Sequence, residues 1–225
     1  SIYLQIQLQR ASAQDDSLPE VLRSIRLSCH MFQGITEATM RHDEAWHFLR
    51  LGRMMERADK TSRILDVKYF ILLPSPVNVG TPYDDLHWAA VLKSVSGFET
   101  YRKQRGRISP RQIVEFLVTD REFPRAIRHC VDMAGESLSV ITGSAAHELK
   151  YPSERLMSVL RAELGEIQVE TVVRSGLHEY LDGLQTKMNA IGDSLKQDFF
   201  ALRHEERTVN RSSQSQWQKS ESTPA

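Results

Sequence analysis

Charged side chains that could bind a ligand or transfer a proton lie along one side of a single stretch that is predicted to be helical. Their spacing of three or four residues places them in one line: Gly52, Glu56, Asp59, Arg63 and Asp66. A carboxylate such as Glu56 can act as an acid/base, and a guanidinium such as that of Arg63 can polarise a substrate. Gly52 stands one turn before Glu56, where the missing side chain lets a ligand or another backbone approach closely.

The same charges also have a structural explanation. Asp59 and Arg63 are four residues apart, and Arg63 and Asp66 are three apart, so both pairs can form ion pairs on one helix. Such a network adds little stability on a surface, but in a core it can specify how neighbouring helices align. The residues leave both interpretations open, and the structural one requires fewer assumptions.

A metal site is a further possibility, because Glu44 and His47 form the Glu-x-x-His spacing of di-iron helical bundles. Those sites need a second Glu-x-x-His pair and more bridging carboxylates, and the sequence has no second pair. A single ion bound by His42, Asp43 and His47 is conceivable, but Asp43 is explained more simply as a helix N-cap. We therefore expect no metal.

Several other classes of function are disfavoured by composition. The 225 residues contain 29 basic and 29 acidic side chains, so the net charge of zero gives no general attraction to nucleic acid or to an anionic membrane. No apolar run approaches the roughly 20 residues that span a bilayer. The arginines and lysines near residues 102–107 suit a solvated helix end. We expect a cytoplasmic protein with no nucleic-acid or membrane partner.

Catalytic motifs and cofactor motifs are also missing from the sequence. There is no recognisable Ser/His/Asp or Cys/His set, and no Gly-rich phosphate loop follows a strand, so we expect no cofactor. The two cysteines, Cys29 and Cys130, are too few for a disulfide framework. Both lie in apolar helical patterns, which predicts that both are reduced core residues.

The charged line belongs to the best helical stretch of the chain, residues 42–73. Asp43 occupies the N-cap position, and Pro74 ends the helix because a proline disfavours the helical conformation of the residue before it. Apolar or small residues recur with helical spacing on another side, which predicts the face that packs in the core: Phe48, Leu51, Met55, Ala58, Ser62, Leu65, Tyr69 and Leu72.

The rest of the chain also has helical periodicity, with no alternating pattern of a strand. The predicted helices span residues 18–40, 42–73, 86–104, 110–118, 124–143, 153–173 and 177–202, with Gly97 interrupting the third. The sequence therefore predicts an all-α fold, an up-and-down bundle of six or seven helices over residues 18–202. Residues 1–17 have only a weak apolar pattern, and the polar residues 203–225 predict a disordered tail.

Beyond these patterns, the stretch around Glu56 resembles the alpha-E family of bacterial proteins, an all-helical domain with a Glu-Arg motif. The resemblance rests on HDEAWHFLRLGRMMERADKTSRILDVKYFILLP, in which Glu56-Arg57 is the Glu-Arg pair, and it extends over roughly residues 18–200. Family members usually carry an earlier copy of the motif, and residues 1–17 do not match it. With a chain that starts at Ser1, we expect either a truncated sequence or a member that has lost half of a paired site.

The resemblance implies a function connected with peptide or amide bonds, because the family is associated with ATP-grasp-type ligases and transglutaminase-like proteins. We expect a non-catalytic helical partner that docks onto such a ligase or presents a peptide or amine to it. In that case acidic residues would hold an amine or a partner arginine, namely Asp43, Glu56, Asp59 and Asp66, while Arg57 and Arg63 would hold a carboxylate. The alternatives are an enzyme with Glu56 as acid/base beside Arg63, and a purely structural scaffold.

Overall fold

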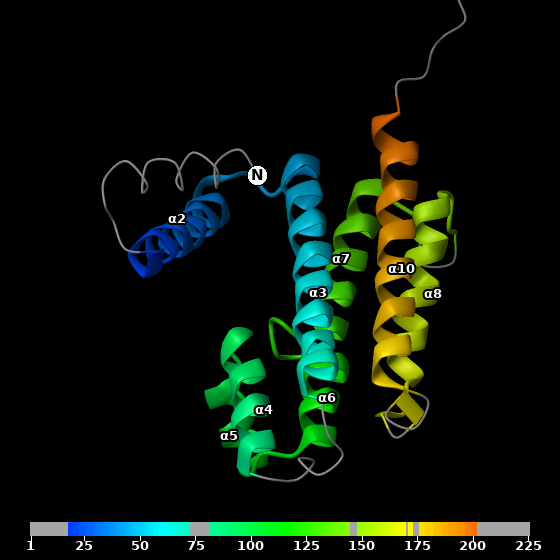
Figure 1. Ribbon diagram of the computed structural model, residues 1–225. Helices are drawn as coiled ribbons and strands as arrows, with labels where there is room; N and C mark the ends of the chain where they lie inside the picture. The colour runs from blue at the N-terminus through cyan, green and yellow to red at the C-terminus, as the bar shows by residue number, and fades with distance from the viewer. Residues whose placement is uncertain (1–17, 73–81, 145–147, 170, 173–175, 202–225) are drawn as a thin grey trace, which may run out of the picture.

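The chain folds into helices joined by short connections. The computed structural model describes residues 18–72, 82–144, 148–169, 171–172 and 176–201, and only the backbone at 68–72 and 82–83. The helices are α2 (Leu18–Thr39), α3 (Glu44–Leu72), α4 (Pro82–Ser94), α5 (Phe98–Arg105), α6 (Pro110–Thr119), α7 (Ile127–Thr142), α8 (Pro152–Glu166) and α10 (Leu177–Leu195), and a π-helical turn, η2 (Lys196–Phe200), continues α10 (Figure 1). The described residues contain no strand, so the all-α prediction is confirmed.

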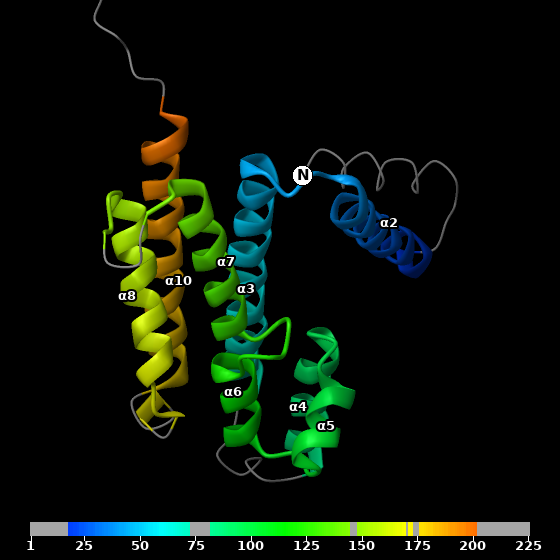
Figure 2. The ribbon, with the colours of Figure 1, turned by 180° about the vertical axis from the view of Figure 1, so that it is seen from behind.

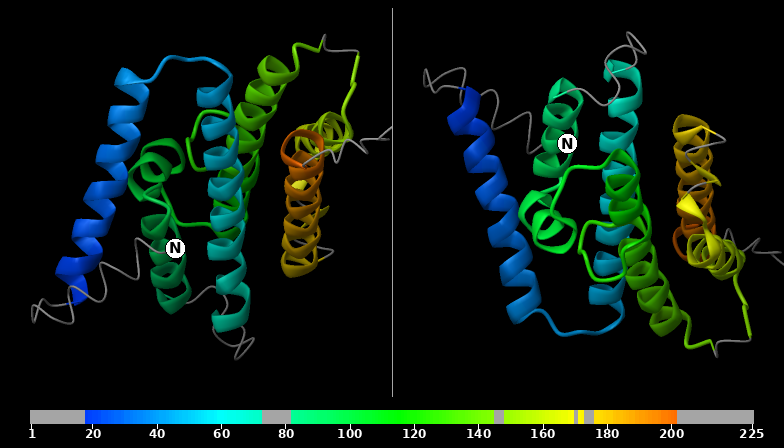
Figure 3. Two further views of the ribbon diagram at one scale, coloured as in Figure 1. Left: turned by 90° about the horizontal axis from the view of Figure 1, so that it is seen from above. Right: turned by 90° about the horizontal axis from the view of Figure 1, so that it is seen from below.

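The centre of the bundle is the pair α3 and α7, which pack side by side along their length (Figures 1 and 2). The helices α8 and α10 cover one side of this pair, and α4, α5 and α6 gather near its lower end. Seen along the bundle, α2 and the α8–α10 pair lie on opposite sides of α3 (Figure 3). The core therefore lies between α3, α7, α8 and α10 and continues into α4, α5 and α6.

The core face of α3 is close to the predicted one. Leu51, Ala58 and Leu65 are buried as expected, and Met54 joins them. Phe48 and Met55 are half-buried, while the side chains of Tyr69 and Leu72 lie outside the described residues. Helical periodicity thus predicted which side of α3 packs against the bundle.

A break at Ser96 and Gly97 divides the predicted helix 86–104 into α4 and α5, which raises the number of described α-helices to eight. Ser96 has a left-handed backbone with φ of 55°, and the Gly97 amide donates to the Leu92 carbonyl at 2.7 Å. A side chain at Gly97 would meet the Phe123 ring at 2.9 Å and the Phe116 ring at 3.2 Å. Gly97 therefore lets this break pack directly on two aromatic rings.

Two other helix boundaries differ from the prediction. α7 begins at Ile127 and not at Pro124, because the Asp120 carboxylate accepts hydrogen bonds from the amides of Glu122 and Phe123 and holds the chain in a turn. α8 ends at Glu166, where the next residue, Ile167, has an extended backbone with ψ of 132°.

The position of α2 is the largest departure from the predicted bundle. Most of its apolar side chains do not pack in the core: Leu22, Leu27, Met31, Phe32 and Ile35 are each more than half exposed, whereas Val21 is buried. Cys29 is exposed as well, so its prediction as a core residue was wrong, whereas Cys130 is buried as expected. An ion pair of 3.7 Å between Arg53 Nη2 and Glu37 Oε2 links α2 to α3.

None of the described helices has the length and continuous apolar character of a membrane-spanning helix. The predicted N-terminal segment 1–17 and the predicted disordered tail 203–225 lie outside the described residues.

Candidate functional site

Two of the predicted site residues, Gly52 and Glu56, lie on the side of α3 that faces away from the core. Helical geometry sets Glu56 roughly opposite the buried residues Leu51, Ala58 and Leu65. Glu56 and Gly52 are exposed, and no hydrogen bond or ion pair engages the Glu56 carboxylate within the described part of the chain. The one candidate acid/base of the sequence therefore has a free carboxylate.

A groove of about 790 Å³ lies between α2 and α3 next to Glu56. Its walls are mostly apolar, and Glu56 and Gly52 contribute to the α3 side. The other lining residues are Ser28, Cys29, Met31, Phe32, Gln33, Ile35, Phe48, Leu49 and Arg53. A Cβ at Gly52 would have no atom within 4 Å, so the glycine leaves this part of the groove open.

Asp59 and Arg63 form the ion pair that their spacing predicted. Arg63 Nε donates to Asp59 Oδ2 at 2.8 Å, and this hydrogen bond raises the pKa of the Arg63 guanidinium. The other carboxylate oxygen, Asp59 Oδ1, is buried and has no hydrogen-bond partner among the described residues. The pair is therefore local to α3, and neither residue lines the groove.

Asp66 binds a residue that the sequence did not connect with it. Its Oδ1 lies 2.8 Å from Nδ1 of His178 at the start of α10, which raises the pKa of His178. The predicted partner of Asp66 on its own helix was Arg63. The sequence separation of 112 residues from Asp66 to His178 explains why periodicity along one helix could not find this pair.

Arg57 points away from its neighbour Glu56, because consecutive residues of a helix are turned by roughly 100° from each other. Its Nη1 donates to the Pro124 carbonyl at 3.1 Å in the connection between α6 and α7, and burial lowers its pKa. The Cys130 thiol donates to the same carbonyl at 3.5 Å, and burial raises the pKa of that thiol to about 11. Glu56 and Arg57 therefore do not form one site.

Asp43 occupies the position just before α3 that was predicted for an N-cap. Its carbonyl accepts the hydrogen bond of the His47 amide at 3.0 Å. His47 Nδ1 is buried without a hydrogen-bond partner in the described chain. Across the described residues, no three His, Cys, Asp or Glu side chains gather in a way that could hold a metal ion. Asp43 thus lies at the start of α3 and is not part of the groove lining.

The comparisons with known proteins agree with this helical architecture. The model of the alpha-E family, an alpha-helical domain with a conserved ER motif, matches residues 1–200. The chain belongs to the alpha-E family. No curated protein and no solved structure matches the chain.

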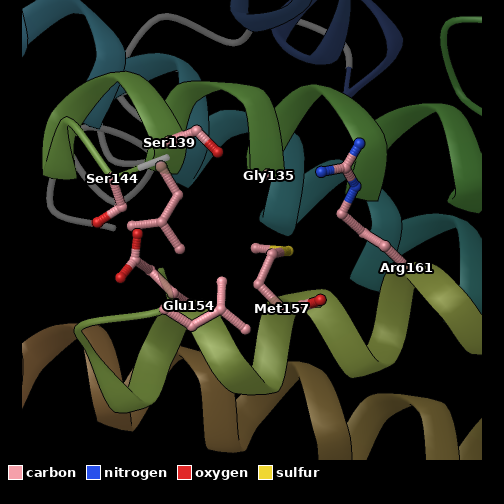
Figure 4. A pocket seen from close by; sticks show the side chains of 9 residues that line it. Gly135, Ser139, Ser144, Glu154, Met157 and Arg161 are labelled. Carbon is pink, nitrogen blue, oxygen red and sulfur yellow. The ribbon is translucent and has the colours of Figure 1, made fainter. Parts of the chain in front are cut away.

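The matched part of this alpha-E chain contains a second Glu-Arg dipeptide, Glu154-Arg155, which neither helical spacing nor the family resemblance had indicated as a site. Glu154 is buried in the first turn of α8, where Thr142 Oγ1 donates to its carboxylate at 2.6 Å and the Tyr151 amide donates at 2.9 Å. It lines a cavity of about 110 Å³ between α7 and α8, with Arg161 at the opposite end (Figure 4). The Ser-Glu following Pro152 indicated a helix start, but nothing in the sequence indicated the burial of Glu154.

Proposed function

We propose that this alpha-E protein is a non-catalytic partner of an ATP-grasp-type ligase and that its α2–α3 groove receives a segment of that ligase. The observation that carries the proposal is the free Glu56 carboxylate beside an apolar groove. The choice of a ligase rests on the association with ATP-grasp-type ligases that the alpha-E resemblance implies. In the same proposal the protein works in the cytoplasm, and a transglutaminase-like protein is a second possible partner.

The groove determines the chemistry of the segment that fits it. Apolar walls formed by residues such as Met31, Phe32 and Leu49 favour apolar side chains. The Glu56 carboxylate adds a requirement for a cation, either a lysine or arginine of the ligase or the amine of a presented peptide. A hydrogen bond to a charged group contributes about 1.5–3 kcal/mol, so Glu56 can distinguish partners with this cation from partners without it.

The enzyme alternative stays a prediction. It requires Glu56 and Arg63 to act on one substrate, but Arg63 donates to Asp59 and is not among the residues that line the groove. Among the described residues, no histidine that could activate a nucleophile such as Ser28 or Cys29 lines the groove. We therefore prefer docking over catalysis.

Binding can be tested with an ATP-grasp-type ligase purified from the organism that makes this chain. We expect calorimetry to detect a complex, and Glu56→Gln to weaken it at least tenfold, since the amide keeps the shape of the side chain and removes its charge. Glu99→Gln is the matched control, because Glu99 is an exposed carboxylate on α5 that does not line the groove. Equal affinities for both variants would overturn the role of Glu56.

The two cysteines report where the ligase binds. Iodoacetamide should alkylate exposed Cys29 much faster than buried Cys130, and the ligase should slow the reaction of Cys29. Unchanged alkylation of Cys29 in the complex would place the ligase elsewhere.

Activity measurements separate the partner from the enzyme. As a partner, the protein should change the rate at which the ligase releases ADP in the presence of an amine or peptide acceptor. It should form no product on its own. Turnover by this protein without the ligase, lost in Glu56→Gln, would instead support the enzyme alternative.

A further inference from the structure

Three arginines surround one carboxylate on the seam between α7 and α8. Arg161 Nε of α8 donates to Asp132 Oδ1 at 3.1 Å. From the α7 side, Arg128 Nε and Arg121 Nε each lie 3.9 Å from Asp132 Oδ2. The Asp132 side chain is only 18% exposed.

This cluster has more positive charge than the protein neutralises. Three guanidiniums face one carboxylate, and none of the other acidic residues in the described chain forms an ion pair with these arginines. The nearby Glu136, one turn after Asp132 on α7, lies 3.6 Å from Arg50 of α3 instead. Two positive charges therefore remain around Asp132, with the side chains of Arg128 and Arg161 only 21% and 38% exposed and that of Arg121 70% exposed.

One glycine, Gly135, lets Arg161 lie across the opposite helix. A Cβ at Gly135 would lie 2.7 Å from Arg161 Cδ and 3.0 Å from its Nε and Nη1, so only a glycine admits this position of the Arg161 side chain. Figure 4 shows Arg161 reaching from α8 to α7 beside Gly135. On the other helix, a Cβ at Gly165 would lie 3.7 Å from Arg128 Nη2. The Arg161 guanidinium thus lies directly on the α7 backbone at Gly135, and that of Arg128 lies near Gly165 of α8.

We propose that Arg121, Arg128 and Arg161 form a binding site for a phosphoryl dianion. A phosphate monoester carries a charge of about −1.5 to −2 at neutral pH, which matches the two positive charges left by Asp132. Asp132 accepts from Arg161 Nε and acts as a positioning residue, while the terminal nitrogens of the guanidiniums stay available for phosphate oxygens. Guanidinium forks suit the oxygen spacing of phosphate and bind it through paired hydrogen bonds.

This inference does not depend on the groove or on a ligase, because the α7–α8 seam shares no residue with the α2–α3 groove. The phosphoryl group can belong to free inorganic phosphate or to a nucleotide. Both sources present the same dianion, and the rest of the nucleotide would have to lie outside the arginine cluster.

The test is a titration of the full chain with inorganic phosphate, followed by calorimetry, against sodium chloride at equal ionic strength. We expect saturable phosphate binding, with a Kd that rises at least tenfold in Arg161→Gln and in Arg128→Gln. Arg107→Gln is the matched control, because Arg107 is exposed and its side chain has no partner among the described residues. Its Kd should stay within twofold of that of the unmodified chain.

Gly135→Ala keeps all charges and displaces only Arg161, so it should weaken phosphate binding even if an arginine variant does not fold. A second titration with AMP identifies the source: tighter binding of AMP than of phosphate indicates a nucleotide, and equal binding indicates free phosphate. The proposal is overturned if phosphate binds no better than chloride, or if Arg107→Gln weakens binding as much as Arg161→Gln does.

Discussion

His178 Nδ1 and Asp66 Oδ1 lie 2.8 Å apart and join the start of α10 to α3. The hydrogen bond from the imidazole to this carboxylate raises the pKa of His178 above its ordinary value. A charged imidazole is therefore favoured in the folded state more than in the unfolded state. Its contribution to the free energy of unfolding is complete below about pH 6.5 and is lost as the pH rises through the higher folded-state pKa.

We expect the urea concentration at the unfolding midpoint to decrease as the pH is raised from about 6 to about 8. This decrease should be smaller in Asp66→Asn. NMR titration of the His178 ring should give a higher pKa in the unmodified chain than in this variant. Identical titration curves for both proteins would show that Asp66 does not control His178.

Arg57 should matter more for stability than Arg63, although both lie on α3. Arg57→Ala removes the hydrogen bond to the Pro124 carbonyl at the edge of the core, with an expected loss of about 1–2 kcal/mol. Arg63→Ala breaks only the exposed pair with Asp59 and should cost about 0.5 kcal/mol or less. Denaturation in urea measures both values, and a larger effect of Arg63 would contradict the structural role given to Arg57.

The same substitution should have opposite effects at two glycines. Gly97→Ala places a methyl group 2.9 Å from the Phe123 ring in the packed break between α4 and α5, so it should destabilise the fold by about 1–3 kcal/mol. Gly192 lies inside α10, and a Cβ added there would have no atom within 4 Å. Because alanine favours a helix more than glycine does, Gly192→Ala should stabilise the fold by about 0.5–1 kcal/mol. Thermal unfolding should therefore shift in opposite directions, and a shift in one direction would refute the packing described at Gly97.

Glu154 should make the fold sensitive to acid. Burial raises the pKa of its carboxyl, but hydrogen bonds from Thr142 and the Tyr151 amide outweigh burial and leave this pKa below its ordinary value. Its contribution to stability is therefore present above about pH 4.3 and is lost as the pH falls through the lower folded-state pKa. We expect Glu154→Gln to cost about 1–3 kcal/mol at pH 7 and less at pH 3, as measured by urea denaturation. An equal cost at both values would mean that the ionised carboxylate is not what stabilises the start of α8.

Helical periodicity predicted local structure well and long-range neighbours poorly. It identified the buried side of α3 and the interruption at Gly97, because both depend on residues within a few turns. It also placed Asp59 and Arg63 together, since this pair lies on one helix.

Periodicity could not say what covers an apolar stripe. The apolar residues of α2 have the spacing of a core helix, yet Phe32 and Ile35 are exposed. Helical spacing shows that a helix has an apolar face, but it does not show which surface packs against that face. The contacts of Asp66 with His178 and of Arg57 with Pro124 depend on which helices meet. The resemblance to the alpha-E family supplied the Glu-Arg pair, but the structure was needed to show that Arg57 contacts the Pro124 carbonyl while Glu56 lines the α2–α3 groove.

The exposed apolar side of α2 affects how tightly any partner can bind. A helix with few tertiary contacts keeps much of its conformational freedom, so it opens at a free-energy cost well below that of unfolding the whole domain. A partner that fills the groove must also order α2, and this loss of entropy reduces the affinity below what the buried area alone would give. In exchange, α2 can adjust to its partner, and the complex is expected to release more readily than one formed on a rigid surface.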